Sequence, residues 1–208
     1  MQQRVRIDLI GITKKYCNNF LFSQITASIE PGACLAVTGS NGSGKSTLLK
    51  VIAGLVRPTA GHVKVRTGER ELSASEQAGC FGLVSPEIIF YNNMTGWENI
   101  NFILRSAGVR YDPARQADCL RAVGLPGRCH QLVGAYSTGM RQRLKFAVLA
   151  ALERPVWLLD EPSSNLDGTG KLLVKSLVMD ALAKNTVVVI ATNEAEEAAY
   201  AEQKIMLG

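Results

Sequence analysis

The chain has 208 residues, a formal net charge of +5, 47% hydrophobic residues and 20% charged residues. This length suffices for one sizeable domain with a buried core, and the composition is ordinary for a globular protein. The longest apolar runs are strand-sized, far below the ~20 residues of a membrane span, and the N-terminal MQQRVRIDLIG has no secretion-signal pattern. We therefore expect a cytoplasmic protein.

Charged and sulfur-containing residues argue against several classes of partner. Lys and Arg are scattered, so no nucleic-acid partner is expected, while a modest attraction to an anionic membrane face stays open. The five cysteines form no C-x-x-C pair, which is typical of a reducing compartment. The two histidines have no partner at ligand spacing, so we expect no metal cage.

The first half of the chain is rich in strand patterns. Alternating apolar residues over 4–31 predict two or three short strands before a turn at Pro31 and Gly32. Three further strands and one helix follow: strands at CLAVT (34–38), HVKVR (62–66) and CFGLV (80–84), and a helix at STLLKVIAGL (46–55).

The second half is first helical and then alternates. The predicted elements are helices near 97–107, 112–123, 139–152 and 169–184, strands at VWLLD (156–160) and VVVIA (187–191), and an Ala/Glu-rich helix over 193–203. Strands that alternate with helices favour a largely parallel sheet.

A glycine-rich segment, GSNGSGKST, lies between the apolar strand and the helix that follows it. Gly39, Gly44, Lys45 and Ser46 match G-x-x-x-x-G-K-[ST], in which glycines let backbone N–H groups wrap around phosphate oxygens at a helix N-terminus. Lys45 is expected to bridge the β- and γ-phosphates of ATP, and the Ser46 hydroxyl to bind Mg²⁺. The predicted nucleotide-binding residues of this segment are Gly39, Ser40, Asn41, Gly42, Ser43, Gly44, Lys45, Ser46 and Thr47.

The segment VWLLDEP (156–162) supplies the carboxylates for hydrolysis. Asp160 ends an apolar strand and is predicted to orient the Mg²⁺ shell, while Glu161 is predicted to orient or deprotonate the attacking water. Lys45 and Glu161 are therefore predicted to be catalytic. The fold class is therefore α/β: a P-loop NTPase core with a mostly parallel sheet and an N-terminal antiparallel subdomain, plus an inserted α-helical lobe formed by the helical middle of the chain.

These motifs, in this order, resemble the nucleotide-binding subunits of ABC transporters over essentially the whole chain. Tyr16 lies where that family has an aromatic that stacks on adenine, and YSTGMRQRL (136–144) occupies the place of its signature segment. SSNLD (163–167) resembles the loop after the second nucleotide motif, and VVVIAT leads to the position of the family's switch histidine.

The resemblance implies a single ATP-binding domain over 1–208, with an α/β core of 1–86 and 153–208 and an inserted helical lobe of 87–152. It also implies a head-to-tail homodimer or heterodimer, in which Ser137, Thr138, Gly139 and Met140 contact the ATP held by the opposite copy. Such dimers energise an integral membrane subunit, so we expect peripheral attachment at the cytoplasmic membrane face. Compact subunits of this kind resemble exporter ATPases, including the one linked to heme export in cytochrome c maturation.

The helical lobe is expected to dock the membrane subunit. Its first segment, IIFYNNMTGWENI, gathers apolar and aromatic residues, of which Tyr91 and Trp97 are predicted to lie nearest the interface.

Four positions depart from the family pattern. Thr138 replaces a glycine and Met140 a glutamine of the signature, Pro86 stands where a glutamine is expected, with Glu87 as a substitute, and Asn193 replaces the switch histidine. The resemblance thus adds Asn193 to the predicted catalytic set of Lys45 and Glu161, since asparagine can donate a hydrogen bond to the γ-phosphate, although it cannot become cationic or shuttle a proton. We therefore expect slow hydrolysis by the lone homodimer. Two alternatives stay open: a soluble ABC-type ATPase acting on another assembly, and a nucleotide-dependent switch that has lost hydrolysis.

Overall fold

The structure, a computed structural model, describes residues 4–110 and 112–208. These residues group into two units. The first unit contains the described residues up to Leu83 together with Arg154–Glu161 and Val178–Gly208, and the second contains Val84–Glu153 and Pro162–Leu177. The sequence-based division into 1–86, 87–152 and 153–208 stays a prediction.

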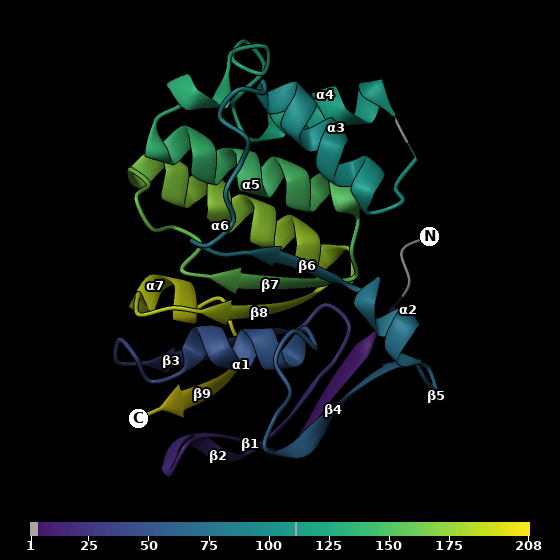
Figure 1. The fold of residues 1–208 in the computed structure, drawn as a ribbon, viewed down its shortest axis with the longest axis vertical. Coiled ribbons are helices and arrows are strands. Elements are labelled where there is room, and N and C mark those ends of the chain that lie inside the picture. Colours follow the sequence, from purple (N-terminus) through teal and green to yellow (C-terminus); the bar gives the residue numbers. More distant parts are fainter. Residues whose placement is uncertain (1–3, 111) are drawn as a thin grey trace. The chain divides into compact units, whose positions relative to one another are not determined.

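The first unit holds two β-sheets and short flanking helices (Figure 1). Its elements are β1 (Arg6–Tyr16), β2 (Asn19–Ile29), β3 (Cys34–Gly39), α1 (Lys45–Ile52), β4 (Ala60–Thr67), β5 (Arg70–Glu71), α2 (Ala74–Ala78), β6 (Phe81–Val84, whose last residue belongs to the second unit), β7 (Val156–Asp160), β8 (Val187–Ala191), α7 (Ala195–Ala198) and β9 (Gln203–Leu207).

The N-terminal sheet is antiparallel, with the strand order β2-β1-β4-β5. The expected two or three short strands are instead two strands of 11 residues each, joined as a hairpin in which Tyr16 pairs with Asn19. The register shifts along β1 are the reason: bulges absorb the breaks in alternation that predicted separate strands.

The second sheet has the strand order β6-β7-β8-β3-β9, and β3, β7, β8 and β9 pair in parallel. The predicted strands at 34–38, 80–84, 156–160 and 187–191 are confirmed within a residue. Because parallel strands end at one edge of the sheet, the residues that follow β3, β7 and β8 gather there. The predicted α/β class, with a parallel sheet and an N-terminal antiparallel sheet, is confirmed.

The predicted C-terminal helix over 193–203 is wrong in extent. Only Ala195–Ala198 is helical, and Gln203–Leu207 forms β9, which pairs with β3 from Leu35 to Gly39. The Ala/Glu composition favours a longer helix, but α7 has no side-chain cap and ends at Ala198, and the chain turns over 199–202 before β9 begins at Gln203.

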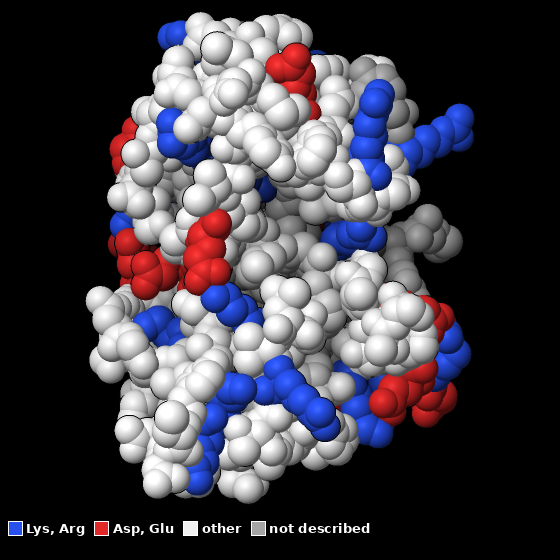
Figure 2. Space-filling model, in the orientation of Figure 1, with Lys and Arg blue, Asp and Glu red and all other residues white. Residues whose placement is uncertain are grey.

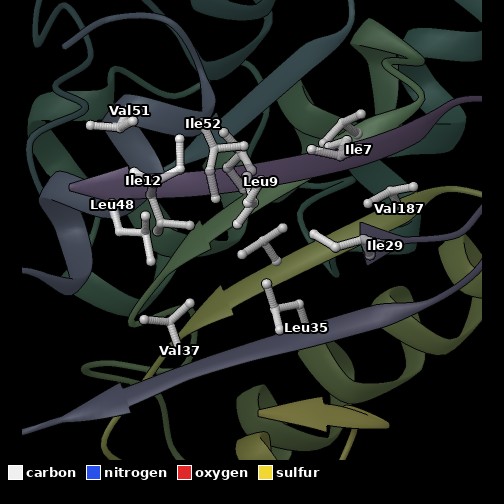
Figure 3. Packing of buried hydrophobic residues seen from close by; sticks show 14 of the residues in the cluster. Ile7, Leu9, Ile12, Ile29, Leu35, Val37, Leu48, Val51, Ile52 and Val187 are labelled. Atoms are coloured by element: carbon white, nitrogen blue, oxygen red, sulfur yellow. The ribbon is translucent and has the colours of Figure 1, made fainter. Parts of the chain in front are cut away.

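Apolar side chains of the two sheets meet in one core (Figure 3). Ile7, Leu9 and Ile12 of β1 point toward Leu35 and Val37 of β3, and all five are at most 1% exposed. Leu48, Val51 and Ile52 of α1 complete this region. The helix that starts at the glycine-rich segment is thus fixed against both sheets.

The second unit is helical. It contains α3 (Gly96–Ser106), α4 (Pro113–Ala122), the 3₁₀ turn η1 (Val133–Ala135), α5 (Thr138–Leu152) and the first part of α6 (Gly168–Ala183), which continues into the first unit (Figure 1). The predicted helices near 97–107, 112–123, 139–152 and 169–184 are confirmed. Thr95, Asp112 and Ser137 cap the first three helices with side-chain oxygens.

The surface carries charges of both signs separated by broad uncharged areas on the face in Figure 2. Within residues 4–110 and 112–208, no helix combines the length and apolar character needed to cross a bilayer.

Candidate functional site

The glycine-rich loop requires glycine at two positions. Gly39 has φ +146°, and a Cβ there would lie 2.1 Å from the Leu207 carbonyl oxygen and 2.7 Å from Ser43 Oγ. Gly44, with φ +100° at the N-cap of α1, would place a Cβ 2.5 Å from Leu21 Cγ. Any side chain at either position would distort the loop, so these glycines are set by close backbone approach as well as by φ.

The Lys45 side chain lies inside the glycine-rich loop and hydrogen-bonds its backbone. This side chain is nearly buried, and its Nζ donates to the carbonyl oxygens of Gly39, at 2.7 Å, and Ser40, at 3.0 Å. The Ser43 N–H donates to the Ser40 carbonyl at 3.1 Å. The loop therefore curls around its own ammonium group, which places a positive charge at the start of α1.

The start of α1 is suited to an anion. The helix has no side-chain cap, so the N–H groups of its first turn lack the acceptor that caps provide. Ser43 Oγ is buried and has no hydrogen-bond partner within the described part of the chain. Free donors and the positive end of the helix dipole together fit a phosphate group.

A hollow of about 330 Å³ opens at this loop, and a carboxylate reaches it from another strand. Glu161 lines the hollow with residues of the loop, although it lies more than a hundred positions later in the chain. The complete lining is Leu21, Asn41, Gly42, Gly44, Lys45, Ser46, Thr47 and Glu161.

The two acidic residues at the end of β7 differ in backbone conformation: Asp160 is the last residue of the strand, and Glu161 begins the turn after it. Asp160 is 7% exposed and lies in register with Ala191 of β8. Glu161 has φ +46°, and its N–H donates to the Ala191 carbonyl at 2.8 Å. The left-handed backbone at Glu161 turns the chain out of the strand, and the hydrogen bond to β8 fixes that turn.

Asn193 contacts the glycine-rich loop directly. Its Nδ2 donates to Asn41 Oδ1 at 2.6 Å. The preceding residue is anchored, because the Thr192 N–H donates to the Val37 carbonyl at 3.0 Å and the Thr192 hydroxyl hydrogen-bonds the Glu197 carboxylate. Sequence reasoning missed Glu197, which is 2% exposed, because nothing in NEAEEAAY separates it from its exposed neighbour Glu196.

Tyr16 does not line the hollow. It ends β1, its side chain is 53% exposed, and Lys14 Nζ lies 4.8 Å from the centre of its ring. An exposed ring at this position is free to stack on a flat partner, but adenine stacking by Tyr16 stays a prediction.

The signature segment lies in the second unit, at the start of α5. Ser137 is the N-cap, and its Oγ accepts from the Met140 N–H at 3.2 Å, which leaves the hydroxyl proton to donate elsewhere. Ser137 and Thr138 are exposed. None of residues 137–140 has a positive φ, and a Cβ on Gly139 would lie 3.7 Å from its nearest neighbour, Asn165 O. The threonine at 138 therefore costs no backbone strain.

The segment expected to carry a glutamine also lies in the second unit. Pro86 and Glu87 are exposed, and the Ser85 carbonyl accepts from Lys145 Nζ at 2.7 Å. Of the two residues predicted to lie nearest a partner, Tyr91 is 55% exposed, whereas Trp97 is half-buried with its ring 5.9 Å from that of His130.

Comparison with protein families and curated proteins gives one consistent result. The model of the ABC transporter family matches residues 22–164. The cytochrome c biogenesis ATP-binding export protein CcmA of Nitrobacter winogradskyi is 34% identical over 176 residues, which cover 83% of this chain and 84% of that protein. The CcmA of Rhizobium etli is 36% identical over 187 residues, 85% of this chain and 82% of that protein.

Solved structures share the fold. An ATP-binding cassette captured as a dimer after hydrolysis, with ADP and Pi, has a TM-score of 0.83 at 24% identity and covers 97% of this chain and 94% of its own. A putative ABC transporter ATP-binding protein from Pyrococcus furiosus has a TM-score of 0.84 at 23% identity and covers 97% of both chains. Together with the family match over 22–164, these findings confirm the resemblance carried by the motifs: the chain belongs to the ABC transporter family and is one of its ATP-binding proteins.

Proposed function

We propose that this chain binds MgATP at the glycine-rich loop and hydrolyses it with Glu161. The observation that carries the proposal is the single hollow that Lys45, Ser46 and Glu161 line together. An ammonium group, a hydroxyl and a carboxylate around free helix N–H groups are the parts that phosphoryl transfer to water needs.

Each residue then has a definite task. Lys45 and the loop N–H groups hold the phosphates, Glu161 orients the water and accepts its proton, and Asn193 donates to the γ-phosphate. Ser46 and Asp160 are suited to hold Mg²⁺, which would neutralise phosphate charge. Within the described residues no three His, Cys, Asp or Glu side chains cluster as a metal site, so the ion would depend on ATP and water for its other ligands.

Two copies, or this chain and a related one, would enclose each ATP. The exposed Ser137 and Thr138 at the start of α5 present a hydroxyl proton and first-turn N–H groups to a phosphate held by another copy. Closing of this dimer on ATP would act on an integral membrane subunit at the cytoplasmic membrane face. The names of the CcmA proteins support export as the direction.

The direct test compares phosphate release by the purified chain, its Glu161→Gln variant and a control, Glu196→Gln, in which an exposed acid of α7 is changed. Loss of the catalytic carboxylate should lower turnover at least about 100-fold while ATP still binds. Equal turnover in all three proteins would refute the assignment of Glu161.

A nucleotide-dependent switch is the second candidate. The bond from Asn193 to Asn41 supports it, because a neutral amide ties the switch position to the loop and cannot shuttle a proton. If Asn193 slows a hydrolysis that the chain has kept, Asn193→His should raise turnover above that of the parent chain. Slow turnover that this change does not raise, with tight ATP binding, would favour a switch.

A further inference from the structure

Glu197 is a buried acid of the first unit that has no task in the proposed reaction. It belongs to α7, the short helix that follows β8 and lies beside the end of that strand (Figure 1). Glu197 is 2% exposed, whereas Glu196 of the same helix is exposed. Burying a carboxyl group costs free energy that burying an apolar side chain would not, so the contacts of this acid have to offset that cost.

The contact that matters for the nucleotide site is the one with Thr192. The Thr192 hydroxyl donates to Glu197 Oε2 and accepts from the Glu194 N–H at 2.9 Å. A hydroxyl rotates freely and has a single proton, so an acceptor on one side and a donor on the other fix its orientation. The Thr192 N–H also donates to the Val37 carbonyl at 3.0 Å. Thr192 is therefore held at its backbone and at its side chain.

The helix α7 does not hold this turn by itself. It has four residues, and its N-cap residue, Glu194, makes no side-chain capping hydrogen bond. A helix of this length is not stable on its own. The hydrogen bond between Thr192 and Glu197 joins the residue after β8 to the last turn of α7, and it thereby closes the turn between them.

The segment that this bond fixes meets two parts of the nucleotide site. The Ala191 carbonyl accepts from the Glu161 N–H at 2.8 Å, and Asn193 Nδ2 donates to Asn41 Oδ1 at 2.6 Å. Asn193 is exposed, so packing does not hold its side chain, whereas Asn41 lines the hollow at the glycine-rich loop. A side-chain amide has two N–H donors, so Asn193 can bond Asn41 with one and a phosphate oxygen with the other.

We propose that Glu197 is a positioning residue of the nucleotide site: through the Thr192 hydroxyl it holds Asn193 where the side-chain amide meets the γ-phosphate of ATP. The proposal rests on the proposed function, which gives Asn193 that contact, and it adds the residue that sets the contact up. A donor acts on a phosphate only when the residues behind it fix its position, and Glu197 is the buried group that does so here.

The test measures how strongly the chain prefers a nucleotide that has a γ-phosphate. Isothermal titration gives the dissociation constants of ADP and of β,γ-imido-ATP, which resists hydrolysis, each with Mg²⁺. The ratio of the ADP constant to the analogue constant reports contacts to the γ-phosphate, because the other phosphates are common to both. Asn193→Ala should lower this ratio about tenfold, since it removes a hydrogen bond to a charged group.

Variants of the Thr192–Glu197 pair should have the same effect. Glu197→Ala and Thr192→Val each remove the hydrogen bond, so each should lower the ratio about tenfold and leave the affinity for ADP unchanged. Glu197→Gln keeps a side-chain oxygen that can accept from Thr192, so it should retain the parent ratio. Glu196→Ala, which changes an exposed acid of α7, is the control.

The parent ratio in Glu197→Ala overturns the proposal. If Glu197→Ala loses ADP binding because it does not fold, Thr192→Val decides, since valine keeps the shape of the threonine side chain. The parent ratio in Thr192→Val then overturns the proposal in the same way.

Combining the changes separates positioning from a merely structural role. If Glu197 acts through Asn193, adding Glu197→Ala to Asn193→Ala lowers the ratio no further, because the contact is already lost. A merely structural acid would instead weaken the binding of both nucleotides, with or without Asn193. A further fall of about tenfold in the double variant overturns the proposal. So does a Glu197→Ala effect where Asn193→Ala has none.

This inference and the proposed function fail differently. A chain that releases phosphate from ATP but keeps the parent ratio in Glu197→Ala contradicts the inference and leaves the ATPase function standing. A chain in which the ratio falls as expected, but which releases no phosphate, contradicts hydrolysis by Glu161 and leaves the role of Glu197 standing.

Discussion

In the first unit, the residue type at single positions is constrained by the close approach of neighbouring backbone atoms as much as by the chemistry of the nucleotide site. Gly39 lies against the last strand, and the Leu207 carbonyl occupies the space that a side chain would need. The motif at the nucleotide site is therefore tied to β9, which is distant in sequence and adjacent in the sheet.

Gly39→Ala is expected to abolish ATP binding and lower the melting temperature. A Cβ 2.1 Å from a backbone carbonyl forces the loop or β9 to move, at a φ that alanine rarely adopts. Gly127→Ala is the control, since a Cβ there would meet nothing within 4 Å. ATP binding and thermal unfolding measure both effects, and a Gly39→Ala protein that binds ATP normally would contradict the close approach.

Cys34 should be chemically inert although other cysteines react. Burial raises the pKa of its thiol to about 12, and the side chain is 2% exposed. Iodoacetamide at pH 8 should modify the exposed Cys17 and spare Cys34, as read by peptide mass spectrometry.

The same shift has a consequence for stability. The ordinary thiol pKa is 9.0 and the folded value is higher, so the folded state holds the proton more tightly. The contribution of Cys34 to the free energy of unfolding is therefore fully present below pH 9, and it is lost as pH rises toward 12. Cys34→Ala should weaken this loss in chemical unfolding experiments, and an unchanged pH dependence would contradict the shift.

At the scale of elements, buried polar side chains of the second unit hydrogen-bond the backbone of its loops and hold these loops in place. Asn99 of α3 is 1% exposed and satisfies the segment before the helix: its Oδ1 accepts from the Tyr91 N–H at 2.9 Å, and its Nδ2 donates to the carbonyls of Tyr91, Met94 and Thr95. This segment carries the exposed Tyr91 and borders the hollow of the second unit that Arg141 and Lys145 line. One buried amide therefore fixes the position of a segment that lies at the surface.

Asn99→Ala should destabilise the protein by roughly 3 kcal/mol, because it leaves a buried donor and several acceptors without partners. Asn93→Ala, an exposed asparagine of the same segment, should have little effect. Chemical denaturation measures the difference, and equal stability of the two variants would contradict the role of Asn99.

Comparison of the predicted and observed elements shows which sequence patterns predict secondary structure correctly. The apolar runs at 34–38, 156–160 and 187–191 predict buried strands because strands covered on both faces have no polar side to alternate with. The C-terminal Ala/Glu segment is predicted less well: its composition favours a helix over 193–203, but only Ala195–Ala198 is helical, and the chain turns before β9 pairs with β3.

The whole molecule is proposed to work as a pair, in which the exposed signature residues Ser137 and Thr138 of one copy contact the ATP bound at the glycine-rich loop of the other. Glu161→Gln, saturated with ATP and Mg²⁺, should therefore form a dimer in light scattering, since bound ATP is not consumed. Adding Ser137→Arg to this variant should keep it monomeric, whereas Ser106→Arg, an exposed serine of α3, should not.

Failure of this prediction is also informative. A Glu161→Gln protein that stays monomeric at saturating MgATP would contradict a homodimer, and a heterodimer with a related chain would then be tested by mixing. A dimer that the Ser137→Arg change does not prevent would contradict contact through the signature.

The sequence by itself determined the fold class, the glycine-rich loop, Asp160 and Glu161, because these depend on local spacing: a strand, a turn that only glycine allows, and a helix start. Only the tertiary structure decided which contacts bring Glu161 and Asn193 to that loop, that Glu197 fixes Thr192, and that Lys145 and Arg141 share a hollow whose described lining contains no acid. Burial and pairing of a polar group depend on neighbours that are distant along the chain, and no local pattern records them.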